Sequence, residues 1–241
     1  MKTFTDEVAQ RLDENRRNEP LNRTAHAFVE ASTQPKYSYN FSWLGRPIIQ
    51  YPQDIVAMQE IIWAVKPGAI VETGVAHGGS LIFHSSMLEL IGAGGRVVGV
   101  DIDIRQHNRA AIEAHPMSRR ITMIQGSSIA PEVLAQVKAA AEGKERVLVC
   151  LDSMHTHEHV LSELHAYAPM TTVGSYCVVF DTIIEDLPRD MYPDRPWWPG
   201  NSPKTAVREF LRTNPGFEID KAIDHKLLIS VARDGYLRRR G

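Results

Sequence analysis

Short apolar segments alternate with helical patterns through most of the chain, and this alternation limits the fold more than any other feature of the sequence. A strand that is followed by a helix and then by another strand packs as a parallel sheet with helices on both faces. The five predicted strands cover residues 69–72, 96–103, 121–124, 146–152 and 174–181. We therefore predict a doubly wound α/β sheet that binds its ligands at the carboxyl ends of the strands.

The spacing of apolar residues between and after these strands supports the same fold. From Pro52 to Val65 the apolar residues form a stripe at helical spacing, and the segment 66–68 (Lys-Pro-Gly) ends the helix. Two short strands, around residues 217–219 and 227–231, complete a seven-stranded sheet. The other helices are predicted over residues 81–91, 106–114, 132–141, 160–164 and 206–211.

The first strand ends in an acid and continues into a turn with three glycines, Val-Glu-Thr-Gly-Val-Ala-His-Gly-Gly-Ser over residues 71–80. Glycines allow the backbone to approach a ligand closely, and Ser80 is placed to cap the following helix. Glu72 would repel a pyrophosphate but would favour an ammonium group or ribose hydroxyls, which is the polarity of S-adenosylmethionine. The histidine of the turn is either a contact to cofactor or substrate or only a polar turn residue. The predicted cofactor residues here are Glu72, Gly74, His77, Gly78 and Ser80.

The same edge of the sheet carries further candidates for cofactor binding. Asp101 lies in the acidic end of the second strand, where a carboxylate can hold the two hydroxyls of a ribose. Ser127 and Ser128 follow the third strand, and Asp152 ends the fourth. We expect these four residues to lie beside the glycine turn.

Two carboxylates, those of Asp152 and Asp181, end the fourth and fifth strands and so converge at this edge. Oxygen ligands of this kind hold Mg²⁺, which keeps several waters and would acidify a substrate hydroxyl. His155 lies three residues after Asp152 and is the candidate general base. The alternative for the two acids is ordinary capping of strand ends.

The segment from Asp152 to His159 also contains three histidines, which invites a zinc or iron interpretation. Residues two apart in a helix point to different sides, and His155 and His159 share one side only if the helix already includes both. A metal-binding histidine cluster is therefore the weaker interpretation.

Composition restricts the classes of function. The chain has 27 Lys and Arg against 29 Asp and Glu, so it lacks the basic excess of a nucleic-acid-binding protein. It has no apolar run of the roughly 20 residues that span a bilayer and no apolar core of a signal peptide at its start, so we expect a cytoplasmic protein. Cys150 and Cys177 fall inside predicted strands and are expected to be buried thiols.

Two segments lie outside the strand and helix alternation. Residues 1–35 are polar and helix-prone, and we expect a helical N-terminal arm, followed by one domain over residues 36–241. The arm packs on a second subunit or over the active site. We also expect a homo-oligomer. An aromatic loop over residues 37–47 packs on the core or on substrate. Residues 182–203 contain five prolines and two tryptophans between Leu187 and Pro203, and we expect them to form a lid.

These motifs resemble the cephalosporin hydroxylase family of class I methyltransferases, which is related to sugar O-methyltransferases of macrolide and rhamnose-glycan pathways. The resemblance extends from Trp43 to Tyr236 and depends most on Val-Glu-Thr-Gly-Val-Ala-His-Gly-Gly-Ser, Gly-Val-Asp-Ile-Asp, Leu-Asp-Ser-Met-His and Asn-Ser-Pro-Lys-Thr-Ala-Val. It implies a Rossmann-like fold of seven strands with a reversed last strand, S-adenosylmethionine at Glu72, Gly74 and Asp101, and often Mg²⁺. It also implies that His155 is the base.

The chain departs from that family at one position. The family usually has two acids at the end of the fifth strand, and here Phe180 replaces the first of them. Three alternatives follow: Asp152 and Asp181 hold the ion weakly with waters, another acid such as Glu185 completes the site, or no ion binds.

The sequence therefore predicts an S-adenosylmethionine-dependent O-methyltransferase that acts on a hydroxyl of a sugar or of a glycosylated small molecule. A dehydrogenase is disfavoured because the turn lacks Gly-x-Gly-x-x-Gly. A hydroxylase would need a redox centre, for which only the histidine cluster is a candidate. The non-enzyme alternative is a binding or scaffold protein that has lost catalysis, and Phe180 is the feature in its favour.

Overall fold

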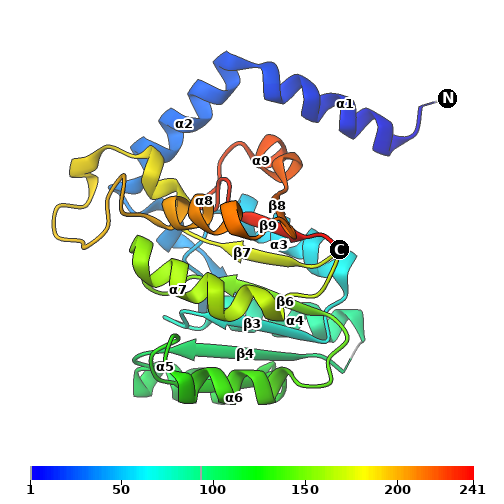
Figure 1. The fold of residues 1–241 in the computed structure, drawn as a ribbon, viewed down its shortest axis with the longest axis vertical. Helices are drawn as coiled ribbons and strands as arrows, with labels where there is room; N and C mark the ends of the chain where they lie inside the picture. The colour runs from blue at the N-terminus through cyan, green and yellow to red at the C-terminus, as the bar shows by residue number, and fades with distance from the viewer. Residues whose placement is uncertain (1, 93) are drawn as a thin grey trace.

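A seven-stranded sheet with the strand order β5-β4-β3-β6-β7-β9-β8 organises the molecule (Figure 1). The computed structural model describes residues 2–92 and 94–241. The first five strands of the chain within this sheet are parallel, and β9 runs antiparallel to both β7 and β8. The predicted mostly parallel sheet with a reversed last strand is confirmed. The strands are β3 (Ala69–Thr73), β4 (Arg96–Asp101), β5 (Ile121–Gln125), β6 (Val147–Leu151), β7 (Tyr176–Val179), β8 (Phe217–Ile219) and β9 (Tyr236–Arg239).

Helices cover both faces of this sheet. The longer ones are α1 (Phe4–Arg17), α2 (Glu19–Thr33), α3 (Pro52–Val65), α4 (Gly79–Ile91), α5 (Gln106–Glu113), α6 (Pro131–Ala141), α7 (His157–Tyr167), α8 (Pro203–Thr213) and α9 (Lys221–Leu227). Short 3₁₀ helices are η1 (Tyr37–Asn40), η2 (Ser118–Arg120), η3 (Ala168–Met170), η4 (Thr182–Asp186) and η5 (Arg189–Met191), and β1 (Ser42–Trp43) pairs with β2 (Arg46–Pro47).

Side chains alternate between the two faces along each strand and so build two cores. In β6, Leu148 and Cys150 pack with residues of α3 and α4, whereas Val149 packs with residues of α6, α7 and α8. Figure 1 shows α6, α7 and α8 in front of the sheet and α3 and α4 behind it. Burial on both faces explains why the central strands are continuous apolar runs. The thiols of Cys150 and Cys177 are buried and free, as expected.

The predicted strand over residues 227–231 is wrong. The chain forms α9 up to Leu227 instead, because the Asp220 carboxylate accepts a hydrogen bond from the amide of Ala222 and caps the helix. The last strand lies later, where Tyr236 pairs with Val178 of β7. The Tyr236 side chain is fully buried, which anchors this strand at that register.

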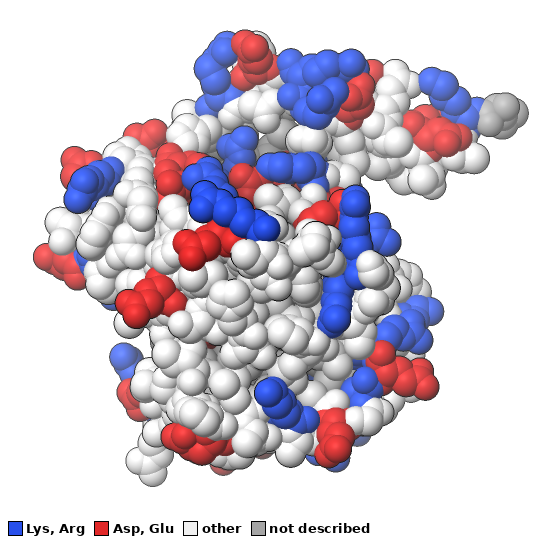
Figure 2. Space-filling model, in the orientation of Figure 1, with Lys and Arg blue, Asp and Glu red and all other residues white. Residues whose placement is uncertain are grey.

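The N-terminal helices extend above the sheet, with α1 pointing away from the body and α2 descending to it (Figure 1). Asn15 of α1 donates a hydrogen bond of 3.2 Å to the carbonyl of His225 in α9. On the face shown in Figure 2, basic and acidic side chains are interspersed and also cover both N-terminal helices. In the part of the chain that the structure describes, every helix is too short or too polar to cross a bilayer.

A buried carboxylate joins α3 to the loop before β9. Asp54 is fully buried and accepts hydrogen bonds from Ser230 Oγ at 2.6 Å, Tyr236 Oη at 2.7 Å and the amide of Val231 at 3.0 Å. Burial raises the pKa of Asp54 from 3.8 to about 6, although these hydrogen bonds act in the opposite direction. The folded state therefore binds the proton of this carboxyl more tightly than the unfolded state does.

We expect the contribution of Asp54 to the free energy of unfolding to be greatest below pH 4 and to fall as pH rises towards 6, levelling off above it. A shift of this size corresponds to about 3 kcal/mol. The difference in unfolding free energy between wild type and Asp54→Asn, measured by urea titration, should change by most of that amount between pH 4 and 7. Tyr236→Phe removes one hydrogen bond but keeps the carboxyl, so it should retain the pH dependence. A difference that is constant over this range would contradict the assignment.

Candidate active site

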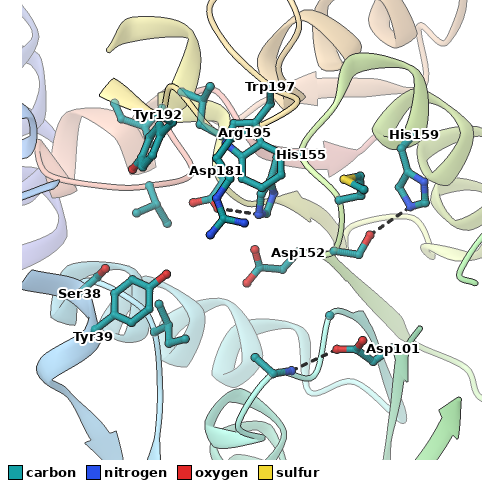
Figure 3. Close-up of a pocket in the computed structure, with 18 of the residues that line it drawn as sticks. Ser38, Tyr39, Asp101, Asp152, His155, His159, Asp181, Tyr192, Arg195 and Trp197 are labelled. Carbon is teal, nitrogen blue, oxygen red and sulfur yellow. Dashed lines mark hydrogen bonds and ion pairs between the residues drawn. The ribbon is translucent and has the colours of Figure 1, made fainter. Parts of the chain in front are cut away.

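A cavity of about 720 Å³ opens at the carboxyl ends of the strands (Figure 3). One part of its wall comes from the glycine turn and the ends of β4, β5 and β6, and another from the end of β7, the lid and the N-terminal segments. The predicted site residues in this wall are Gly74, Asp101, Ser127, Ser128, Asp152, His155 and Asp181. The structure thus brings together residues that are more than 100 positions apart in the sequence.

Gly74 occupies a position that only glycine fits. Its φ is +91°, in the left-handed region, and a Cβ atom here would lie 2.0 Å from the carbonyl oxygen of Asp152. The amide of Gly74 donates to the carbonyl of Val100 at 2.7 Å, which attaches the turn to β4. Bare backbone therefore borders the cavity at this point.

The Asp101 carboxylate connects the second strand to the glycine turn. Its Oδ2 accepts hydrogen bonds from the amides of Val75 at 2.8 Å and Ala76 at 3.2 Å. Its Oδ1 accepts from the amide of Asp103 at 3.0 Å. These three amides fix a carboxylate that also borders the cavity, so Asp101 is placed to accept further hydrogen bonds from hydroxyls.

Glu72 does not face the cavity, which differs from the prediction. Its side chain points towards α4, where Ser80 Oγ donates to it and His84 Nε2 lies 2.8 Å from its Oε2. Its side chain is only 3% exposed, so the carboxylate supports the glycine turn from within the protein. This contact could not be predicted from the turn motif, because His84 lies beyond the turn in α4.

The other predicted residues of the turn also lie outside the cavity wall. Gly78 has a φ of +80° and precedes α4, and a Cβ there would collide with Ile112. The expected capping role of Ser80 is wrong, because the N-cap is Gly78 and the Ser80 hydroxyl is bound to Glu72. The carbonyl of His77 accepts a hydrogen bond of 3.0 Å from Arg46 Nε, so this residue anchors the turn to the segment before α3.

Asp152, His155 and Asp181 form a group at the centre of the cavity, with donor atoms within 4.8 Å of one another. His155 Nε2 lies 3.1 Å from Asp181 Oδ2, and its ring meets the Trp197 ring edge-on at 4.8 Å. Figure 3 shows Asp152 between this pair and Asp101. Within the described chain, neither His155 Nδ1 nor the Asp152 carboxylate has a hydrogen-bonding partner. Both are therefore available to a ligand.

The Asp152 carboxylate lies in an environment that disfavours its charge. Burial and then the neighbouring charge of Asp181 raise its pKa well above the ordinary value. A cation would reverse this effect, since opposite charge within a few ångströms favours the ionised carboxylate. The carboxylates of Asp152 and Asp181 converge, and Asp152 pairs with no Lys or Arg among the described residues; this donor set fits Mg²⁺.

Two neighbouring side chains have roles that the sequence left open. Phe180 is 2% exposed and packs in the core beside α3 and α4, so it takes no part in the cavity wall. Glu185 Oε2 accepts hydrogen bonds from the amide of Gly200 at 2.8 Å and from Ser202 Oγ at 2.7 Å. Glu185 also lies outside the group formed by Asp152, His155 and Asp181.

The three histidines after Asp152 point to different partners. His157 contacts α8, with Nδ1 2.8 Å from Thr205 Oγ1 and Nε2 3.2 Å from Glu209. His159 Nε2 lies 3.1 Å from Ser128 Oγ and 3.2 Å from Ser153 Oγ, in the half of the cavity near β5. The structure therefore separates the histidines and does not form the cluster that a hydroxylase would need.

The sequence predicts a lid with two tryptophans, and Trp197 of this lid lines the cavity. Sequence reasoning did not identify four other residues of the wall, which are Tyr39 of the aromatic loop, Val29 of α2, and Tyr192 and Arg195 of the lid. The aromatic composition of the loop and the lid was the available signal, because an irregular segment rich in aromatic residues usually packs on something. No sequence motif indicated that α2 also borders the cavity. The only indication was the expectation that the N-terminal arm packs on a second subunit or over the active site.

Comparison with known proteins agrees with this geometry. Residues 35–240 match the model of the rhamnosyl O-methyltransferase/CmcI family. The chain belongs to this family. A rhamnosyl O-methyltransferase of Mycobacterium leprae (strain TN) is 29% identical to it over 201 residues, which are 83% of either chain. A rhamnosyl O-methyltransferase of Mycobacterium bovis (strain BCG / Pasteur 1173P2) is 27% identical over 191 residues, 77% of this chain and 73% of the relative.

Solved structures of methyltransferases have the same fold. The apo structure of CmcI superposes with a TM-score of 0.59 at 19% identity, over 84% of this chain and 77% of CmcI. An O-methyltransferase from Bacillus cereus in complex with SAH gives a TM-score of 0.52 at 15% identity, over 81% of both chains. These similarities confirm the class I methyltransferase fold.

Proposed function

We propose that this protein is an S-adenosylmethionine-dependent O-methyltransferase that methylates a hydroxyl of a sugar or of a glycosylated small molecule. The observation that carries the proposal is a single cavity that joins the glycine turn and Asp101 to the group of Asp152, His155 and Asp181. Family membership and the rhamnosyl O-methyltransferases among the relatives support the same activity and the same class of acceptor.

The half of the cavity near β3, β4 and β5 fits the cofactor. Gly74 leaves room for the polar end of the ligand, and Asp101 is held by three amides where it can accept from ribose hydroxyls. Ser127 and Ser128 line the wall beyond Asp101, where the adenine of the cofactor would lie. The unpartnered Asp152 carboxylate suits a positively charged ligand. Glu72 lies outside the cavity wall and supports the turn through Ser80 and His84.

His155 is placed to act as the general base in the other half. With Nε2 directed at Asp181, Nδ1 is the nitrogen that accepts the proton of the acceptor hydroxyl, and the Asp181 carboxylate stabilises the resulting imidazolium. When bound, S-adenosylmethionine would supply the methyl group of its sulfonium to the acceptor oxygen, and S-adenosylhomocysteine would be the other product. The protein contributes alignment of these groups and placement of charge.

Asp152 and Asp181 are the residues that would hold a Mg²⁺ ion. Such an ion would lower the pKa of an acceptor hydroxyl and fix its position. The acceptor itself would lie against Tyr39, Tyr192 and Trp197, whose rings offer flat faces to a sugar. The cytoplasmic location, the homo-oligomer and the division into an arm (1–35) and a domain (36–241) stay predictions.

We expect calorimetry to show binding of S-adenosylmethionine and S-adenosylhomocysteine, and mass spectrometry to show a methylated product in a panel of rhamnosides, other glycosides and nucleotide sugars. Asp101→Asn should weaken cofactor binding by about tenfold, because an amide cannot replace a carboxylate that accepts from several donors. Binding without methylation of any acceptor would favour the scaffold alternative. Absence of cofactor binding would contradict the proposal.

A further inference from the structure

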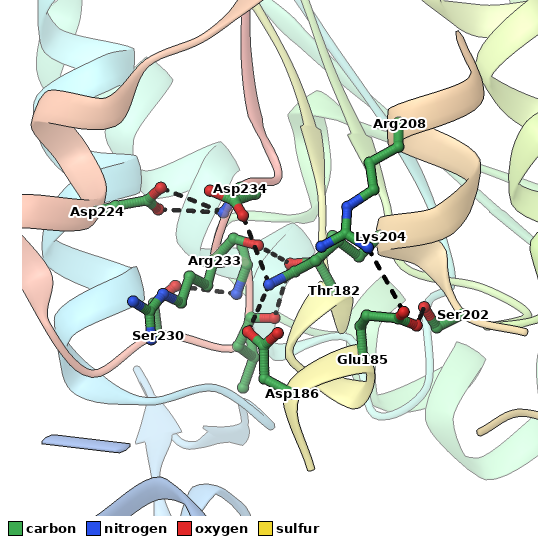
Figure 4. A network of polar contacts seen from close by, with 12 residues as sticks. Thr182, Glu185, Asp186, Ser202, Lys204, Arg208, Asp224, Ser230, Arg233 and Asp234 are labelled. Atoms are coloured by element: carbon green, nitrogen blue, oxygen red, sulfur yellow. Dashed lines mark hydrogen bonds and ion pairs between the residues drawn. The ribbon is translucent and has the colours of Figure 1, made fainter. Parts of the chain in front are cut away.

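The two ends of the lid (residues 182–203) are fastened to each other (Figure 4). Glu185, near its first end, accepts hydrogen bonds from Gly200 and Ser202 near its last end. The Ser202 side chain is fully buried, so this contact is shielded from water. The residues of the lid that line the acceptor half of the cavity lie between these two points.

A buried lysine adds further contacts at the last end of the lid. Lys204 is the second residue of α8, its side chain is 2% exposed, and its Nζ donates to Asp186. Nζ also lies 3.6 Å from a carboxylate oxygen of Asp234. Lysine is almost never fully buried unless its charge is paired, and burial lowers the pKa of this ammonium while Asp186 raises it.

Asp234 belongs to the loop before β9, and this loop is bound to the end of β7, next to Asp181. The amide of Val179 donates to the carbonyl of Gly235 at 2.8 Å, so the loop before β9 is bound directly to β7. Thr182, which follows Asp181, donates from Oγ1 to the carbonyl of Arg233 at 2.6 Å. Lys204 therefore joins the start of the lid, the start of α8 and the loop before β9 around the Asp181 backbone.

We propose that Lys204 is a positioning residue for methyl transfer, which holds the lid so that Trp197 packs on His155 and Tyr192 and Arg195 border the acceptor half of the cavity. Asp181 has a φ of +54°, and the segments that Lys204 joins flank this constrained residue. The His155–Trp197 contact at 4.8 Å is the link from the lid to the base. The proposal depends on the proposed function for its activity readout, whereas its readout of lid mobility does not.

The test compares Lys204→Met, Lys204→Arg and wild type. Methionine keeps the length of the side chain without its charge, and arginine keeps the charge. Lys221→Met is the matched control, because Lys221 also pairs with Asp234 but is 52% exposed and does not contact Asp186. Asp186→Asn removes the lid partner, which is 26% exposed, and serves as a second variant if Lys204→Met does not fold.

Limited trypsin digestion followed by mass spectrometry measures cleavage after Arg189, which is exposed within the lid. We expect cleavage at this bond to be at least about threefold faster in Lys204→Met and Asp186→Asn than in wild type, because a released lid opens more often. Lys204→Arg should be intermediate, and Lys221→Met should match wild type. Equal cleavage in wild type, Lys204→Met and Asp186→Asn would overturn the proposal.

In the activity readout, Lys204→Met should raise the KM for the acceptor by about tenfold, because the lid borders the acceptor half of the cavity. Its affinity for S-adenosylhomocysteine, measured by calorimetry, should stay within about twofold of wild type. A loss of cofactor affinity as large as the change in KM would indicate a general structural role and overturn the proposal. If wild type does not bind S-adenosylhomocysteine, the proposed function fails while the digestion still decides the role of Lys204.

Discussion

Replacing His155 with alanine is expected to lower the kcat of methyl transfer by about 10²- to 10⁴-fold, the usual contribution of a general base. The imidazole lies in the cavity wall with Nε2 bound to Asp181 and Nδ1 free among the described residues. Among the described residues, His155 is the histidine that groups with Asp152 and Asp181. The rate should be measured with an acceptor that wild type methylates, under single-turnover conditions.

His157→Ala is the matched control for this substitution. His157 lies two residues further along the chain, but its ring contacts Thr205 and Glu209 of α8 outside the cavity. We expect its kcat to stay within about threefold of wild type, as for a surface substitution. Added imidazole should restore part of the activity of His155→Ala, because the truncation leaves space beside Asp181. A wild-type rate in His155→Ala would show that another group accepts the proton.

The alternation of strands and helices made the fold predictable, because burial on both faces of the sheet determines which residues the central strands can contain. The last strand was placed wrongly because its position depends on a contact with a distant residue. Residues 227–231 are apolar enough for a strand, but their position depends on Asp54, which lies more than 170 residues earlier and binds the loop at Ser230 and Val231. A local pattern does not contain such a contact.

Site residues could be predicted where a position at the end of a strand is enough to bring them to the cavity. They could not be predicted where their role depends on contact with another side chain. Gly74, Asp101 and Asp152 border the cavity because all parallel strands end at one edge. Glu72 also ends a strand, yet His84 and Ser80 draw its carboxylate away from the cavity. Lys204 stands in the motif Asn-Ser-Pro-Lys, but only the fold brings Asp186 and Asp234 to its ammonium group.

Asp152→Asn is expected to lower kcat/KM by about 10²-fold and to raise the Mg²⁺ concentration that gives half-maximal activity by at least about tenfold, because one of two carboxylate ligands is lost. Chelation of divalent ions should lower the activity of wild type for the same reason. Glu185→Gln is the control for the metal titration: Glu185 is bound to Gly200 and Ser202, so its substitution should leave the half-maximal Mg²⁺ concentration unchanged. Full wild-type activity in chelator would contradict a role for the ion.

Asp152→Asn should be more stable than wild type, although it is less active. Because burial and Asp181 raise the pKa of Asp152, the ionised carboxylate destabilises the folded state relative to the unfolded one at neutral pH. Asparagine removes that charge, so Asp152→Asn should have a higher Tm than wild type in chelator, and added Mg²⁺ should reduce the difference by stabilising wild type alone. A more stable and less active variant is the result expected where a site holds uncompensated charge for function. A lower Tm in chelator would show that Asp152 supports the fold rather than a bound cation.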